Sequence, residues 1–126
     1  GKINRVTPQA VREGVVSQAV SRDIVPLLQY VVDNHNIQPR FDQSRYSVGG
    51  KTGTAQIAKP EGGYLKDDFN GTYLGFAGGD RPQYVIAVFV HKPKISGYAG
   101  SAAAQPLFAD IAHMLINNGY VSPKTR

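Results

Sequence analysis

Three strand-like segments follow one another in the middle of the chain, and they limit the folds that are open to it. They span 45–58, 72–78 and 84–90, and the turn Gly79-Asp80-Arg81-Pro82 joins the last two. Strands with short or moderate connections pair with their neighbours in antiparallel fashion, so the sequence predicts an antiparallel meander. The segment 84–90 is almost continuously apolar, which predicts a strand covered on both faces.

Helical periodicity appears on both sides of these strands. Apolar residues from Ile24 to His35 recur at the spacing of one helical face, and Asp23 as the N-cap would place Pro26 in the first turn. A second helix is expected over 102–118, with Gly119 as its C-terminal cap. Its predicted buried stripe consists of Leu107, Phe108, Ile111, Ala112 and Leu115. The predicted fold class is therefore α+β, an antiparallel β-sheet flanked by helices.

The other segments are expected to be irregular. A short strand is predicted near Val11–Val16, loops are predicted over 37–44, 59–71 and 92–100, and 121–126 is predicted to be a loose tail. The 126 residues suffice for one compact domain and not for two. The chain opens on Gly1 rather than Met, which suggests a processed product or a piece of something longer.

Composition excludes several classes of function. The formal charge of +5 and pI near 9.6 permit an anionic partner, but the basic residues are scattered, which argues against nucleic-acid binding. Without cysteine there is neither a disulfide nor a thiolate metal site, and the histidines show no ligand spacing, so no metal is expected. No apolar run reaches the roughly 18 residues of a membrane span, so an anchor would lie outside this chain.

The segment 48–56 has the composition of a ligand-holding strand. It combines three glycines with Lys51, Thr52 and Thr54, where a buried structural strand would be richer in Val, Ile and Phe. A nucleotide-binding phosphate loop is excluded, because Arg45 stands where that motif needs glycine and no helical pattern follows Thr52. Without other information, Lys51 could equally be a solvated charge that protects an edge strand from aggregation.

Several motifs in a fixed order identify a family. They are Gly50-Lys51-Thr52-Gly53-Thr54-Ala55-Gln56, Tyr73-Leu74-Gly75-Phe76-Ala77-Gly78, Pro82-Gln83-Tyr84, Gly97-Tyr98-Ala99-Gly100 and Ala103-Ala104-Gln105-Pro106-Leu107-Phe108. Together they resemble the C-terminal part of the transpeptidase domain of a class B penicillin-binding protein, of the septal or elongation type, over essentially the whole chain. Lys-Thr-Gly is one of three signatures of these proteins and of serine β-lactamases.

The resemblance implies serine acyl transfer on peptidoglycan. Its substrates would be D-Ala-D-Ala stem peptides and β-lactams, with no cofactor, on the extracytoplasmic (periplasmic) side of the cytoplasmic membrane in the bacterial cell envelope. It implies that Lys51 stands beside the serine of a Ser-x-Asn motif, that the Thr52 and Thr54 hydroxyls bind the carboxylate beside Gly53, and that the Thr54 backbone N–H donates to the oxyanion. Strand alternation puts the two threonines on one face and Lys51 on the other, so Lys51 has to reach around the strand edge.

The nucleophile is absent from the sequence. No serine has a lysine three positions later, and there is no Ser-x-Asn. The rest of the site is therefore expected N-terminal to Gly1 or on another chain, and residues 1–126 alone are expected to be inactive and marginally stable or prone to aggregation. Two alternatives are a serine β-lactamase or β-lactam sensor domain, and a non-catalytic basic module that binds an anionic wall polymer.

Overall fold

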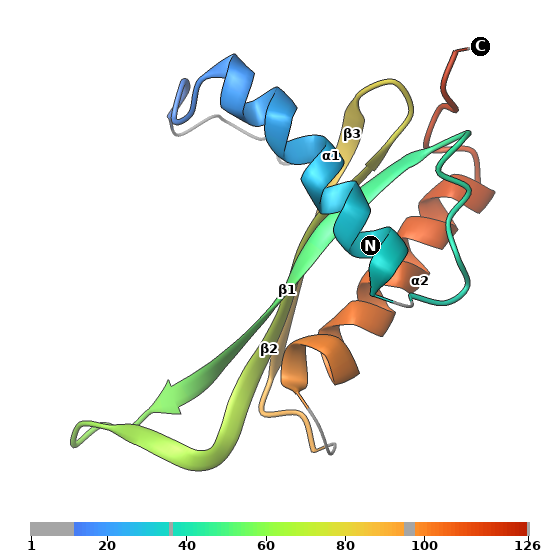
Figure 1. Cartoon of the computed structure of the whole chain (residues 1–126). Helices are drawn as coiled ribbons and strands as arrows, with labels where there is room; N and C mark the ends of the chain where they lie inside the picture. Colours follow the sequence, from blue (N-terminus) through green and yellow to red (C-terminus); the bar gives the residue numbers. More distant parts are fainter. Residues whose placement is uncertain (1–11, 36, 95–97, 126) are drawn as a thin grey trace, which may run out of the picture.

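A three-stranded antiparallel sheet with one helix before it and one after it forms the molecule (Figure 1). The computed structural model describes residues 12–35, 37–94 and 98–125. The strand order is β1-β2-β3, so the predicted α+β class and the meander are confirmed. The elements are α1 (Gln18–Asn34), β1 (Ser47–Ala58), β2 (Tyr64–Gly78), β3 (Pro82–His91), the π-helical turn η1 (Gly100–Ala104) and α2 (Gln105–Asn117).

The two helices lie on opposite faces of the sheet. A Cβ on Gly49 would lie 3.0 Å from the backbone nitrogen of Gln29 in α1, whereas one on Gly75 would lie 2.5 Å from the Phe108 ring of α2. Gly75 pairs with Gly50 across the ladder, and Gly50 points away from the face of Gly49 because side chains alternate along a strand. We call these two sides the α1 face and the α2 face.

The core lies between the α2 face and α2. The rings of Tyr73 and Phe108 stack there with centroids 4.2 Å apart, and both side chains are almost fully buried. Removing a side chain of this size from water contributes roughly 2–3 kcal/mol. The stripe predicted for the last helix is right for Phe108 and Ala112 but wrong for Leu107 and Ile111, which are exposed. The small side chains of Ala109 and Ala112 let α2 lie close to the sheet. The buried face of α2 is therefore narrower than the predicted apolar stripe.

The prediction that β3 is covered on both faces is wrong for this structure. Ile86 points to the α2 face and is buried, but Val85 and Phe89 point to the α1 face and are 76% and 64% exposed. The physical reason is that α1 packs on β1, beside Gly49, and does not extend over β3. Figure 1 shows α1 crossing the sheet and its first turns projecting beyond it.

The loop predicted over 59–71 is mostly strand. β2 begins at Tyr64, and Ala58 pairs with Tyr64 and Gln56 with Phe69. The turn between β1 and β2 is short, and the backbone N–H of Lys59 donates to the Gly63 carbonyl at 3.0 Å. This part of the hairpin extends beyond both helices (Figure 1). The side chains of residues 64–70 are exposed or only half-buried, so the segment lacks the apolar alternation by which strands are recognised in a sequence.

The start of α1 also differs from the prediction. Ser17, not Asp23, is the N-cap, and its hydroxyl accepts from the Val20 N–H at 3.2 Å, so Pro26 stands inside the helix. Residues 12–17 form no strand, and Val11 lies outside the described residues, so the predicted strand near Val11–Val16 is wrong over its described part. No helix in the described ranges is both long and apolar enough to cross a membrane.

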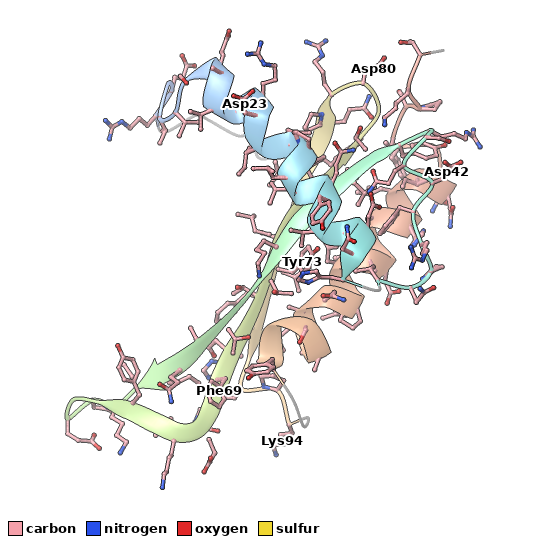
Figure 2. All side chains as sticks on the ribbon, viewed as in Figure 1. Asp23, Asp42, Phe69, Tyr73, Asp80 and Lys94 are labelled. Carbon is pink, nitrogen blue, oxygen red and sulfur yellow. The ribbon has the colours of Figure 1, made fainter. Side chains whose placement is uncertain are left out.

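The C-terminal segment is packed rather than loose. The Lys124 backbone N–H donates to the Arg45 carbonyl at 2.7 Å, and the Thr125 hydroxyl donates to the Asp80 carboxylate at 2.6 Å. Figure 2 shows Asp80 in the turn between β2 and β3, beside this segment. Gly119 follows α2 with a φ of 73°, as a C-terminal cap requires, so that part of the prediction is confirmed.

Candidate functional site

The Lys-Thr-Gly-Thr segment lies in the middle of an edge strand. β1 has β2 on one side and no strand on the other among the described residues. Backbone groups of β1 that point away from β2 are therefore open to a ligand in extended conformation. Lys51 and Thr54 are exposed, and Thr52 and Gly53 are half-buried.

Lys51 and Thr52 are joined by hydrogen bonds around the strand edge. Lys51 pairs with Leu74 on the α1 face, and Thr52 pairs with Tyr73 on the α2 face. The Lys51 Nζ nevertheless donates to Thr52 Oγ1 at 2.9 Å and to the Thr52 carbonyl at 3.1 Å. The long lysine side chain can bend in this way because no strand flanks that edge of β1 in the described sheet. The ammonium therefore lies beside the threonine hydroxyl although the two side chains start on opposite faces.

Thr54 is held by a segment distant in sequence. The backbone N–H of Gly100 donates to Thr54 Oγ1 at 3.0 Å. A Cβ on Gly100 would lie 2.5 Å from the Gly53 carbonyl oxygen, so only glycine lets the start of η1 approach β1 this closely. A hydroxyl that accepts one hydrogen bond keeps its proton for another acceptor. Thr54 therefore retains a donor for an anion.

The Tyr73 ring packs against the motif strand at Gly50. A Cβ on Gly50 would lie 2.3 Å from Tyr73 Cε1, so glycine at this position makes room for the ring. Burial raises the pKa of Tyr73 to about 12, because the phenolate would lose its hydration. Its hydroxyl has no hydrogen-bond partner among the described residues. Figure 2 places Tyr73 at the middle of the sheet, close to α2.

A small apolar cavity adjoins Thr54. Its volume is about 200 Å³, and it is lined by Thr54, Phe69, Tyr98 and Ala99. Figure 2 shows Phe69 on β2 between Tyr73 and the hairpin tip. Sequence reasoning did not assign Phe69, Tyr98 or Gly100 to the site. Tyr98 and Gly100 belong to one of the motifs that carried the family resemblance, which was an available signal, whereas Phe69 stood in a segment taken for a loop.

The structure brings together the residues predicted from the motif, but it adds no nucleophile to them. Both hydrogen bonds of the Lys51 ammonium go to Thr52, and none goes to a serine of the described chain. Within the described ranges no group of three or more His, Cys, Asp or Glu residues could hold a metal ion. The arrangement offers a cation, two hydroxyls and an open strand edge, which suit an extended ligand that ends in an anion.

Comparison with known proteins identifies the family. A family model described as the penicillin binding protein transpeptidase domain matches residues 2–113. The chain is 33% identical over 107 residues to a probable peptidoglycan D,D-transpeptidase, PbpC, of Pseudomonas aeruginosa, covering 85% of this chain and 19% of that protein. It is 35% identical over 109 residues to the stage V sporulation protein D of Bacillus subtilis, covering 86% of this chain and 16% of that protein.

Solved structures show the same fold. The chain matches the apo transpeptidase domain of penicillin-binding protein 3 from Burkholderia pseudomallei with a TM-score of 0.69 and 28% identity, covering 99% of this chain and 37% of that one. It also matches penicillin-binding protein 3 from Mycobacterium tuberculosis in complex with ampicillin, with a TM-score of 0.68 and 30% identity, covering 98% of this chain and 29% of that one.

The chain spans less than a fifth of the length of these two curated relatives and just over a third of the solved Burkholderia domain. The family model nevertheless matches most of the described residues. The chain belongs to the penicillin-binding protein transpeptidase domain family.

Proposed function

We propose that this chain supplies one wall of the active site of a peptidoglycan D,D-transpeptidase, and that the attacking serine lies outside residues 1–126. The family match and the relative named as a probable D,D-transpeptidase support this activity. The observation that carries the proposal is the contact of Lys51 Nζ with Thr52 Oγ1 at 2.9 Å, because a cation beside a hydroxyl at an open strand edge supports the binding of a carboxylate there.

Lys51 provides positive potential and assists proton transfer at the serine of the Ser-x-Asn motif. Its side chain starts on the α1 face and its ammonium reaches the strand edge, so it is accessible from both sides of β1. A positioned proton-transfer group of this kind contributes typically about 10²–10⁴-fold to a rate.

Thr52 and Thr54 bind the C-terminal carboxylate of the substrate. Both point to the α2 face, where their hydroxyls stand two positions apart along β1. The Gly100 N–H fixes the Thr54 oxygen, which leaves the Thr54 hydroxyl proton to donate to the carboxylate. Gly53, which has no side chain, lets the substrate backbone lie against the strand, and the Thr54 backbone N–H donates to the oxyanion.

The reaction proceeds in two acyl transfers. The serine oxygen attacks the carbonyl carbon of the D-Ala-D-Ala bond, an ester forms, and the terminal D-Ala leaves as the amine after it takes up a proton. An amine from a second stem peptide then attacks the ester, an amide forms, and the serine hydroxyl is restored. Each step passes through a tetrahedral oxyanion, for which one backbone donor is worth about 3–4 kcal/mol.

A β-lactam occupies the same site. The ampicillin complex of the Mycobacterium tuberculosis relative supports this binding. The drug carboxylate takes the place of the substrate carboxylate at Thr52 and Thr54, and the opened lactam remains as an ester on the serine. This chemistry belongs to the extracytoplasmic side of the cytoplasmic membrane, in a protein anchored through a segment outside residues 1–126.

Labelling with a fluorescent penicillin tests the proposal. The protein required is the complete domain, meaning a polypeptide in which residues 1–126 are joined to the rest of the transpeptidase domain. Lys51→Ala is expected to lower the second-order labelling rate by about 100-fold or more, and the double change of Thr52 and Thr54 to Val by about 10–100-fold. If the Lys51→Ala variant were labelled as fast as the wild-type domain, Lys51 would have no part in the mechanism.

Lys66→Ala provides the matched control. Lys66 is an exposed lysine on the distal part of β2, outside the site. Its removal lowers the net charge by the same amount as Lys51→Ala and is expected to leave the labelling rate unchanged. An equal loss in both variants would assign the effect to net charge rather than to the position of Lys51.

A further inference from the structure

An ion pair joins the distal part of β2 to the first residue after β3. Lys92 Nζ lies 2.9 Å from Asp68 Oδ2, and the two side chains are 41% and 45% exposed. The other ion pair among the described residues links Arg22 to its neighbour Asp23 at 3.6 Å. Within the described ranges, the Asp68–Lys92 pair is therefore the one that connects distant parts of the chain.

The backbone of Lys92 adopts a conformation that lysine rarely takes. Its φ is 45°, in the left-handed region, where no other non-glycine residue of the described chain lies. Such a strained conformation persists only where the surrounding contacts determine it. Directly before it, His91 Nδ1 and Asn70 Oδ1 share a hydrogen bond at 2.8 Å, in the last row of the β2–β3 ladder. Two contacts with β2 therefore fix the point where the chain leaves the sheet.

The segment that begins at Lys92 ends on the motif strand. We call it the β3–η1 connection, because it runs from the end of β3 to the start of η1. At its far end Ala99 lies against β2, since a Cβ on Gly71 would collide with the Ala99 carbonyl. The next residue, Gly100, donates its N–H to Thr54 Oγ1 at 3.0 Å. The connection is thus attached to β2 at its start, through the ion pair, and to β2 and β1 at its end.

The same connection forms one side of the small apolar cavity described above. Tyr98 and Ala99 line that side, and Phe69 lines the side formed by β2. Phe69 directly follows Asp68 along β2. The ion pair therefore links the two segments that line the cavity.

We propose that the Asp68–Lys92 ion pair positions the Thr54 hydroxyl for the reaction. By holding the start of the β3–η1 connection on β2, the pair keeps the Gly100 N–H within reach of Thr54 Oγ1. The inference rests on the proposed function, in which the Thr54 hydroxyl donates to the substrate carboxylate. Neither Asp68 nor Lys92 lines the cavity, so both act through the connection and not by contact with the substrate.

An ordinary surface ion pair would behave differently. Pairs as exposed as this one contribute little to folding stability, so removing the charge of Lys92 is expected to leave the Tm of the complete domain nearly unchanged. A pair without a positioning role would also leave the Gly100 amide and the reaction with penicillin unchanged. These two properties therefore separate positioning from a merely structural contact.

Hydrogen exchange at the Gly100 amide tests the positioning step in the complete domain. Lys92→Asn removes the charge, and asparagine takes the left-handed conformation more readily than most residues, so the backbone can stay as it is. The exchange rate of the Gly100 amide is expected to rise about threefold to fivefold, because its bond to Thr54 opens more often.

Lys94→Asn is the matched control for this substitution. Lys94 is an exposed lysine of the same connection, and it forms no ion pair with a described residue (Figure 2). Its replacement lowers the net charge by the same amount. Exchange at Gly100 is expected to stay at the wild-type rate in this variant.

The kinetics of penicillin acylation give the second readout. Lys92→Asn is expected to raise the apparent dissociation constant of the initial drug complex about threefold to fivefold. The maximal acylation rate constant is expected to stay the same, because the Thr54 hydroxyl binds the carboxylate equally before and during the attack. Reversing the pair, with Asp68→Lys and Lys92→Asp together, is expected to return both readouts toward wild type. Asp68→Lys alone is expected to be at least as impaired as Lys92→Asn.

Three results would overturn the inference. They are unchanged Gly100 exchange in Lys92→Asn, an equal change in Lys94→Asn, and faster exchange in Lys92→Asn with unaltered penicillin kinetics. In the last case other contacts position Thr54. Failure of the proposed function looks different, because the wild-type complete domain would then take no penicillin, while exchange at Gly100 would still report on the ion pair.

Discussion

The backbone N–H of Gly100 donates to Thr54 Oγ1 at 3.0 Å, across 46 positions of sequence. This bond ties the start of the last helical region to the motif strand. The position of the Thr54 hydroxyl therefore depends on a glycine outside the motif.

Gly100→Ala is expected to displace that contact. The new Cβ would lie 2.5 Å from the Gly53 carbonyl oxygen and 3.0 Å from Thr54 Oγ1, so one of the two segments has to move. The loss of one hydrogen bond of about 1–1.5 kcal/mol corresponds to about a tenfold lower rate of penicillin acylation in the complete domain. Ser101→Ala, at the next and exposed position of the same turn, is expected to leave the rate unchanged. An equal loss in this variant would assign the effect to a general disturbance of the turn.

The Tyr73 hydroxyl offers a second prediction. It is buried and has no partner among the described residues, and an unsatisfied buried hydroxyl costs stability. Tyr73→Phe is therefore expected to raise the free energy of unfolding of the complete domain by about 1 kcal/mol, measured by urea titration. A decrease of the same size would mean that the hydroxyl finds a partner in the rest of the domain.

The strand order and the motif strand could be predicted from the sequence because they rest on local signals. Val85 to Val90 is a continuous apolar run, and the turn before it is short, so antiparallel pairing follows from chain geometry. The assignment of Lys51 to a site has a different source, the ordered set of family motifs, and it stays a prediction. Spacing alone left open whether it was a catalytic lysine or an ordinary edge charge.

The features that the sequence did not predict share a physical cause. They depend on contacts between residues far apart in sequence, or on a lack of such contacts. The strand from Tyr64 to Gly71 buries little, so it lacks an apolar pattern. The C-terminal segment is held by Asp80 and Arg45, far from it in sequence. The bond from Gly100 to Thr54 is of the same kind, and no local pattern could predict it.

Position 50 is expected to tolerate only glycine, because the Tyr73 ring occupies the space that a side chain would need. Gly50→Ala would bring a Cβ within 2.3 Å of Tyr73 Cε1, and Tyr73 cannot retreat because it stacks on Phe108. Overpacking of this kind costs about 1–3 kcal/mol of folding free energy. In a Tyr73→Val background the same substitution is expected to cost much less, and an additive double-mutant cycle would contradict the contact.

The contact of Asp80 with Thr125 makes a pH-dependent contribution to stability. Hydrogen bonds from the Thr125 side chain and then its backbone hold the pKa of Asp80 below its ordinary value of 3.8. The contribution is thus fully present above pH 3.8 and is lost as the pH falls through the lower folded-state pKa. Asp80→Asn is expected to lower the urea midpoint at pH 7, with a difference from wild type that narrows below pH 3.8.

Asp67→Asn serves as the control for that titration, since Asp67 is an exposed carboxylate on β2. Its removal changes the net charge by the same amount. A pH-dependent midpoint difference as large as that of Asp80→Asn would assign the effect to charge alone and not to the contact with Thr125.

We infer that residues 1–126 form one wall of a penicillin-binding site and that the nucleophile lies elsewhere in the domain. Intact-mass and peptide mass spectrometry after incubation with benzylpenicillin tests it most directly. One penicilloyl adduct is expected on the complete domain, on a serine outside residues 1–126, and no adduct is expected on the isolated 126-residue chain. An adduct on any serine within residues 1–126, or none on the complete domain, would contradict it.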